Sequence, residues 1–182
     1  MTDILLHTCC APCSAAVLEW LLRNDYEPTL FYYNPNIFPR EEYEKRKQEL
    51  TRYAEKLQLR VIDGDYEQEK WLLYVEGLEN EQERGARCEK CFEMRLIKTA
   101  QIALEQSIDL FATTLASSRW KDLAQIAWAG LVAEASVSEN VKFFNKNWRK
   151  DGLQQRRREL IKENNFYNQN YCGCKFSIRI FD

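Results

Sequence analysis

The stretch Ile4-Leu5-Leu6-His7-Thr8-Cys9-Cys10-Ala11-Pro12-Cys13-Ser14 decides how this chain folds. Its short apolar run is typical of a buried strand, and the run stops at the first cysteines. Ser14 is a suitable helix N-cap. Apolar residues then recur at helical spacing at Val17, Leu18, Leu21 and Leu22. The stretch therefore predicts a strand, a turn that carries cysteines, and a helix.

The same alternation of strand and helix continues along the chain. Further short apolar runs predict strands at 29–33, 60–62, 109–113 and 141–144. Stripes of apolar residues predict helices near 43–57, 71–75, 92–104, 123–132 and 153–164. This order is typical of an α/β fold with a five-stranded parallel sheet and helices on both faces. In such folds ligands bind outside the carboxyl ends of the strands.

Size and composition indicate one soluble domain over residues 1–182. Hydrophobic residues make up 45% of the chain and charged residues 30%, which is ordinary for a globular protein. Because we find neither an apolar run long enough for a bilayer nor a signal-peptide pattern, we expect a cytoplasmic protein without membrane contact. Thiols stay reduced in that compartment, and the odd count of seven cysteines argues against a disulfide framework.

All seven cysteines fall into three tight clusters. These are Cys9, Cys10 and Cys13, then Cys88 and Cys91, then Cys172 and Cys174. Clustered thiolates are the ligands of zinc, Cu(I) and iron–sulfur centres. A zinc ion or a four-iron cluster uses four thiolates, so three remain for a second metal, a reactive thiol pair, or no role. The first cluster follows a strand and the second opens a helix, where the dipole favours thiolate. We expect all three to converge at the carboxyl ends of the strands.

Several interpretations of the cysteines are open. The Cys88-x-x-Cys91 pair alone fits half a zinc site or a redox pair, although thioredoxin-type pairs follow a strand and this one follows a polar loop. One zinc ion would not need Cys9 and Cys10, since adjacent thiolates chelate a single tetrahedral ion poorly. An iron–sulfur centre with a further metal or reactive thiol uses all three clusters and is favoured.

His7, the only histidine, lies two residues before Cys9. A lone histidine inside a strand is most often a core residue whose hydrogen bonds are satisfied. Because it lies near the thiolates, two further roles stay open: proton donor, or hydrogen-bond partner of a metal ligand.

The segment 142–162 is strongly basic. It holds eight lysines and arginines against two acidic residues, a net charge of +6 in a chain of net charge −2. Such a run is usually a solvated helix face. The size of its net charge, however, makes contact with a polyanion a competing explanation. An aromatic ring among cations can also stack a nucleobase. The candidate RNA-binding residues are Trp148, Arg149, Lys150, Arg156, Arg157 and Arg158.

The order of the first elements resembles a known scaffold. A strand, a loop with Ser14, a helix, and Tyr33-Asn34 at the end of the second strand are similar to the Rossmann-like, HUP-type nucleotide-binding fold of ATP-dependent tRNA-thiolating enzymes. Those enzymes carry a glycine-rich phosphate loop. Here residues 8–14 contain proline and thiols, which remove the nest of backbone N–H groups that a phosphate requires. We expect a shared scaffold on which ATP use is lost.

Short blocks of sequence, in order along nearly the whole chain, carry a more specific resemblance. They are Leu6-His7-x-Cys9-Cys10-Ala11-Pro12-Cys13, Phe31-Tyr32-Tyr33-Asn34-Pro35-Asn36-Ile37, Glu83-Arg84-Gly85-x-Arg87-Cys88-x-x-Cys91-Phe92-x-x-Arg95-Leu96, Thr113-Thr114-Leu115, Trp148-Arg149-Lys150 and Tyr171-Cys172-Gly173-Cys174. In these blocks the chain resembles the cobalamin-independent epoxyqueuosine reductases. The resemblance implies reduction of the epoxide of epoxyqueuosine, at the tRNA wobble position, to queuosine. It also implies a [4Fe-4S] cluster, an additional iron, and an external electron donor of ferredoxin or flavodoxin type.

Under this resemblance the cysteines acquire expected roles. Cofactor binding is expected of Cys9, Cys10, Cys88, Cys91, Cys172 and Cys174, metal ligation of all seven cysteines, and catalytic roles of His7 and Cys13. Four thiolates would hold the cluster and three the additional iron, whose open position would polarise the oxirane oxygen. Which cysteine serves which metal is open. Two functions of other classes also stay open: a zinc-stabilised RNA-binding module, and a dithiol oxidoreductase that binds no iron.

Overall fold

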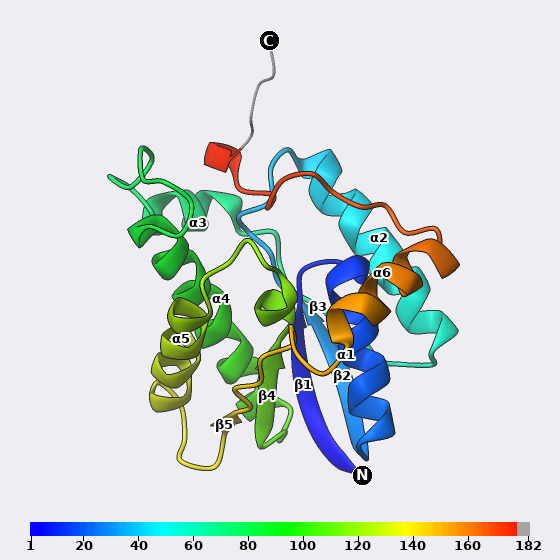
Figure 1. Cartoon of the computed structure of the whole chain (residues 1–182). Helices are drawn as coiled ribbons and strands as arrows, with labels where there is room; N and C mark the ends of the chain where they lie inside the picture. The colour runs from blue at the N-terminus through cyan, green and yellow to red at the C-terminus, as the bar shows by residue number, and fades with distance from the viewer. Residues whose placement is uncertain (178–182) are drawn as a thin grey trace.

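The computed structural model describes residues 1–177 and has an α/β fold built on one five-stranded sheet (Figure 1). The strands are β1 (Thr2–Thr8), β2 (Tyr26–Tyr32), β3 (Val61–Asp63), β4 (Leu110–Thr113) and β5 (Lys142–Phe143). All neighbouring strands pair in parallel, in the order β3-β2-β1-β4-β5. The predicted five-stranded parallel sheet is therefore confirmed.

Helices cover both faces of this sheet (Figure 1). They are α1 (Ala11–Arg23), α2 (Arg40–Lys56), α3 (Gln68–Tyr74), α4 (Ala86–Glu105), α5 (Leu123–Ala135) and α6 (Leu153–Glu163). Helix α1 packs against β2, α2 and α6 on one face, while α4 and α5 pack together on the other. Among the described residues, none of these helices is both long and apolar enough to span a bilayer.

Strand β1 is the centre of the sheet and of the core. Its residues from Ile4 to Thr8 are buried, because β1 pairs with β2 on one side and β4 on the other and is covered by helices on both faces. The connections that leave β1 and β4 go to opposite faces of the sheet. A crevice opens where such connections diverge, at the carboxyl ends of the two strands.

Helix α1 begins earlier than the sequence predicted. Cys10 is the N-cap in an extended conformation, and the first turn contains Pro12, whose fixed φ suits that position. The Ser14 hydroxyl donates to the Cys10 carbonyl at 2.8 Å instead of capping the helix. The prediction of Ser14 as N-cap is therefore wrong. As a result, Cys10 and Cys13 lie at the start of α1, directly beside the end of β1.

Candidate metal centre

Cys9, Cys10 and Cys13 form a compact triad where β1 passes into α1. Their sulfur atoms all lie within 4.8 Å of one another, and the Cys9 and Cys10 sulfurs are 3.8 Å apart. A tetrahedral site with metal–sulfur bonds of about 2.3 Å puts neighbouring sulfurs about 3.8 Å apart. The triad therefore fits a single soft metal ion. Although Cys9 and Cys10 are adjacent in sequence, the strand-to-helix turn brings their sulfurs to a spacing that suits one ion.

Polar side chains of α6 and of the segment after it contact the triad. Arg157 of α6 donates to the Pro12 carbonyl at 2.9 Å, and its Nη2 is 3.9 Å from the Cys13 sulfur. Gln169 Nε2 donates to the Cys10 sulfur at 2.8 Å. Hydrogen bonds from the Cys10 and Cys13 thiols lower the pKa of Cys9 well below its usual value, while burial raises the pKa of Cys10. The triad thus favours at least one thiolate.

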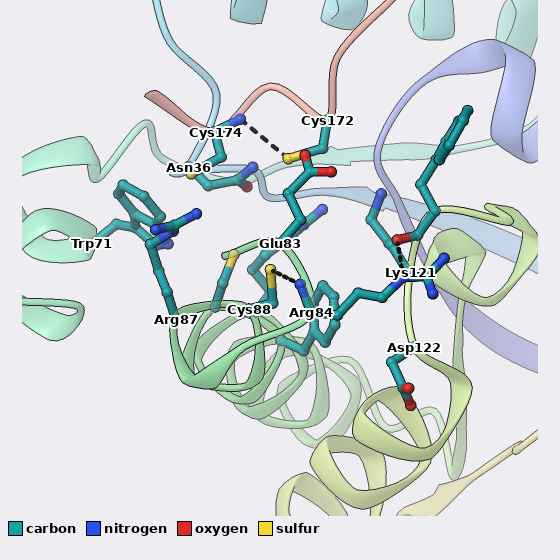
Figure 2. A pocket seen from close by; sticks show the side chains of 14 residues that line it. Asn36, Trp71, Glu83, Arg84, Arg87, Cys88, Lys121, Asp122, Cys172 and Cys174 are labelled. Atoms are coloured by element: carbon teal, nitrogen blue, oxygen red, sulfur yellow. Dashed lines mark hydrogen bonds between the residues drawn. The ribbon is translucent and has the colours of Figure 1, made fainter. Parts of the chain in front are cut away.

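The other four cysteines line one cavity beside the carboxyl ends of the strands (Figure 2). Cys88 and Cys91 come from the first turns of α4, and Cys172 and Cys174 come from the segment after α6. Figure 2 shows Cys88 on one side of the space and Cys172 and Cys174 on the other. The space between these side chains, including the part open to solvent, amounts to about 530 Å³. All seven cysteines are free thiols.

Tertiary contacts fix the segment that carries Cys172 and Cys174. Arg46 of α2 donates to the Cys172 carbonyl at 3.2 Å, and the Phe38 N–H donates to the Gly173 carbonyl at 2.8 Å. The Cys174 N–H donates to the Cys172 sulfur at 3.4 Å. A hydrogen bond from the Cys174 thiol is the main reason why the pKa of Cys172 falls to about 5. Cys172 is therefore ready to bind a metal as a thiolate.

Cys88 and Cys91 differ from the sequence expectation. The Arg84 N–H donates to the Cys88 sulfur at 3.3 Å, as expected near a helix N-terminus. Burial nevertheless raises the pKa of Cys88 and of Cys91 above the usual value. Desolvation thus outweighs the helix terminus, and the predicted preference for thiolate at these two positions is wrong for the metal-free protein.

Unpartnered buried polar atoms gather around this cavity. Within the described residues, Trp71 Nε1, Arg87 Nε, Arg95 Nε and Asn36 Oδ1 have no hydrogen-bond partner, and all four residues line the cavity. Three of the four atoms are N–H donors. Each buried donor without a partner costs about 1–3 kcal/mol. An occupant with acceptor sulfurs and negative charge would satisfy them, so the donor set fits an iron–sulfur centre.

Lys121 and Arg95 connect the cavity to the triad. Burial acts to lower the pKa of Lys121, but the thiolates of Cys172, Cys9 and Cys13 raise it above its usual value. The charge of Arg95 lowers the pKa of both Cys9 and Cys91. Each cation therefore lies within electrostatic reach of both thiol groups.

His7 is fully buried inside the sheet. Its Nε2–H donates to the Tyr33 carbonyl at 3.1 Å, and its Nδ1 accepts from the Thr113 hydroxyl at 2.8 Å. Burial, with a smaller effect from the charge of Arg95, lowers the pKa of His7 to about 3. The ring is neutral and both its nitrogens are bonded within the protein. This geometry is that of a structural core histidine and offers no free nitrogen to a substrate.

Most of the candidate RNA-binding residues are buried or bonded within the protein. Trp148 is buried, donates its indole N–H to the Thr113 carbonyl at 3.0 Å and packs edge-on against Trp20, so it has no ring face for a nucleobase. Arg149 donates to the Lys121 carbonyl at 2.6 Å. Arg156 is neutralised by three glutamates, Glu19, Glu159 and Glu163. Among the six candidates, only Lys150 and Arg158 are exposed.

Sequence reasoning missed several residues at the cavity. Arg87 precedes Cys88, and Arg95 follows Cys91 by four residues on the same helix face, so a helical-spacing argument would have found both. Lys121 follows β4 at the predicted ligand-binding edge, but no motif marks it. Trp71 lies in the helix predicted near 71–75, but its position beside Cys91 depends on the packing of α3 on α4.

Gly173 offers a test of the Cys172–Cys174 geometry. Its φ is +100°, and a Cβ there would lie 2.9 Å from Ile37 Cγ1 and 3.0 Å from Arg46 Nη1. Gly173→Ala is therefore expected to lower the free energy of unfolding by about 1–3 kcal/mol and to weaken metal binding. Gly152→Ala is the matched control, because Gly152 also has a positive φ but open space around it. Equal losses in both variants, measured by urea unfolding and metal titration, would contradict the crowding argument.

The fold and the site together define a class of protein. An α/β fold with a buried triad of free thiols after its central strand, and with a cavity lined by further thiols and unpaired N–H donors, is typical of a protein that holds a soft metal or an iron–sulfur centre.

Comparison with known proteins identifies the family. The family model for epoxyqueuosine reductase QueH matches residues 4–179. Relatives named epoxyqueuosine reductase QueH occur in Histophilus somni (46% identical, over 97% of this chain and 72% of the relative), Acinetobacter baylyi (44%, over 97% and 80%) and Thermotoga maritima (39%, over 98% and 91%). The chain therefore belongs to the QueH epoxyqueuosine reductase family. It is an oxidoreductase, and the resemblance drawn from its sequence blocks is confirmed.

Proposed function

We propose that this protein reduces the epoxide of epoxyqueuosine in tRNA to the alkene of queuosine with thiolate-bound iron as its redox cofactor. The observation that carries the proposal is the cavity with four thiols and unpaired N–H donors beside a triad of three thiols. The net reaction consumes two electrons and two protons, breaks both C–O bonds of the epoxide and releases water. An external donor of ferredoxin or flavodoxin type would supply the electrons.

The cysteine triad and the four cysteines of the cavity suit two different metal centres. The cavity lined by Cys88, Cys91, Cys172 and Cys174 offers the four thiolates that a [4Fe-4S] cluster needs, whereas the close spacing in the triad of Cys9, Cys10 and Cys13 suits a single iron. When bound, the cluster would supply electrons one at a time and the iron would act as a Lewis acid toward the oxirane oxygen. The shared scaffold of the nucleotide-binding enzymes would thus be used without ATP.

The protein's own side chains have separate tasks in this proposal. Trp71, Arg87 and Arg95 donate N–H groups toward the anionic centre and fix its position. Lys121 keeps its proton at neutral pH, because nearby thiolates of both cysteine sets raise its pKa. Its Nζ can therefore donate a proton to the oxygen that leaves as water. The apolar rings of Trp71 and Phe92 in the cavity wall limit the entry of water.

Exposed cations of the basic segment would position the tRNA. Lys150→Ala and Arg158→Ala are each expected to weaken tRNA binding and to reduce the slope of log affinity against log salt by about one. Arg60→Ala is the control, because Arg60 is exposed at the amino end of β3, on the opposite edge of the sheet. Binding measured from low to moderate salt checks this. Unchanged slopes in both variants would show that the run is only a solvated helix face.

The decisive experiment tests metal content and reaction together. Anaerobically purified protein is expected to contain more than four irons and about four sulfides per chain. With a reduced flavodoxin-type donor it is expected to convert epoxyqueuosine-tRNA to queuosine-tRNA, seen by mass spectrometry as the loss of one oxygen. Protein that is fully loaded with one zinc and holds no sulfide would instead support a zinc-stabilised RNA-binding module. Disulfide reduction without iron would support a dithiol oxidoreductase.

A further inference from the structure

Trp120 is a large aromatic side chain left exposed at the mouth of the thiol-lined cavity. It is 63% exposed and lines the cavity together with its neighbours Lys121 and Asp122. Lys121 and Asp122 come from the segment that joins β4 to α5, which borders the cavity in Figure 2. An exposed tryptophan beside a candidate site offers a ligand a large aromatic surface with a polar N–H at its edge.

The backbone around Trp120 is held from two directions. Arg84, which precedes α4, donates from Nε to the Trp120 carbonyl at 3.0 Å and from Nη2 to the Arg119 carbonyl at 3.1 Å. Arg149, from the basic segment, donates to the Ser118 and Lys121 carbonyls. The carbonyls before, at and after Trp120 are thus all bonded to arginine. Because its backbone is fixed, the ring can be presented to a ligand at low entropic cost.

Positive charge surrounds the exposed ring. The Arg119 guanidinium carbon lies 4.7 Å from the centre of the Trp120 ring. The exposed fraction of 63% is what is left after that contact, so ring area is available to a second planar group. Arg84 and Lys121 add charge at the same mouth. An exposed aromatic ring among cations is the arrangement that binds unpaired nucleotides, through stacking on the base and attraction to the phosphate.

We propose that Trp120 is the stacking platform for the purine-type base that carries the epoxide, a step that rests on the proposed function. The base would lie on Trp120 at the mouth, with its epoxide-bearing substituent directed inward to the thiols. Stacking would hold the extruded base in place while Arg119 and Arg84 attract the adjoining phosphates. Trp120, rather than the buried Trp148, then supplies the aromatic contact expected from the sequence.

The test compares two exposed tryptophans. Trp120→Ala is expected to weaken binding of an anticodon stem–loop that carries epoxyqueuosine by about 5- to 150-fold, and Trp120→Phe is expected to recover part of that loss. The salt slope and the iron content are expected to stay unchanged, because stacking releases no counterions and Trp120 is not a ligand. Trp128→Ala is the matched control, since Trp128 is 56% exposed on α5 and does not line the cavity.

The experiment distinguishes failure of the Trp120 proposal from failure of the proposed function. Unaltered affinity in Trp120→Ala, with the unsubstituted protein active, would overturn the platform alone. If the unsubstituted protein holds iron but converts no epoxyqueuosine-tRNA, the proposed function fails. Loss of stem–loop affinity in Trp120→Ala would even then support Trp120 as a base-binding residue. Equal weakening by Trp120→Ala and Trp128→Ala would overturn the inference, because the effect would not be specific to the cavity mouth.

Discussion

Replacing Cys91 with serine is expected to remove the cluster and all epoxide reduction. Cys91 is buried at the cavity wall, where burial raises the pKa of its thiol and the nearby charge of Arg95 offsets part of that rise. A serine hydroxyl is a hard ligand that binds iron weakly, so the loss of one soft ligand opens the site. We expect sulfide to fall from about four per chain to near zero, with conversion of epoxyqueuosine-tRNA undetectable. Iron and sulfide assays on anaerobic protein measure this.

Cys13→Ser is the comparison that separates the two thiol groups. Cys13 belongs to the triad and does not line the cavity. This variant is expected to keep about four sulfides per chain but to lose the additional iron and the activity. Urea unfolding of both variants checks that the fold survives the near-isosteric change. Full sulfide content in Cys91→Ser, or loss of all sulfide in Cys13→Ser, would contradict the assignment of the cluster to the cavity.

The sequence predicted the sheet well because its strands are defined locally. A parallel strand that is buried on both faces needs a continuous apolar run, and Ile4–Leu6 and Leu30–Tyr33 are such runs. The place of the first three cysteines at the carboxyl end of β1 followed from the same pattern, since that strand ends at a turn. Only the ends shifted by a few residues. The start of α1 was misplaced because a proline in the first turn lets the helix begin before Ser14.

The sequence could not show which partners individual side chains contact in the fold. The bond from Trp148 to Thr113 joins residues 35 apart, and the ion pair of Arg156 with Glu19 joins residues 137 apart. In the sequence, a run of lysines and arginines reads the same whether their side chains face solvent or pair with glutamates. The grouping of seven cysteines into a triad and a set of four also needs the fold, because Cys88 and Cys172 meet only after α4 and the segment beyond α6 pack together.

Lys121→Met is expected to slow epoxide reduction by about 100-fold or more, because it removes the proton and the positive charge that face both thiol groups. The nearby thiolates raise the pKa of Lys121 above its usual value. Lys121 is therefore protonated across the neutral range, and its titration should cause no change in rate between about pH 6 and 9. In metal-free protein the same variant should raise the pKa of Cys172, since Lys121 helps to lower it, and so slow its alkylation at neutral pH.

Lys121→Arg separates the charge of Lys121 from its proton. Arginine keeps the positive charge but holds its protons at neutral pH, so it cannot act as a general acid there. We expect this variant to keep normal iron content and fast alkylation of Cys172, while single-turnover reduction of epoxyqueuosine-tRNA stays as slow as in Lys121→Met. Full recovery of the rate by arginine would show that Lys121 acts through its charge alone. An unimpaired Lys121→Met enzyme would remove Lys121 from the reaction altogether.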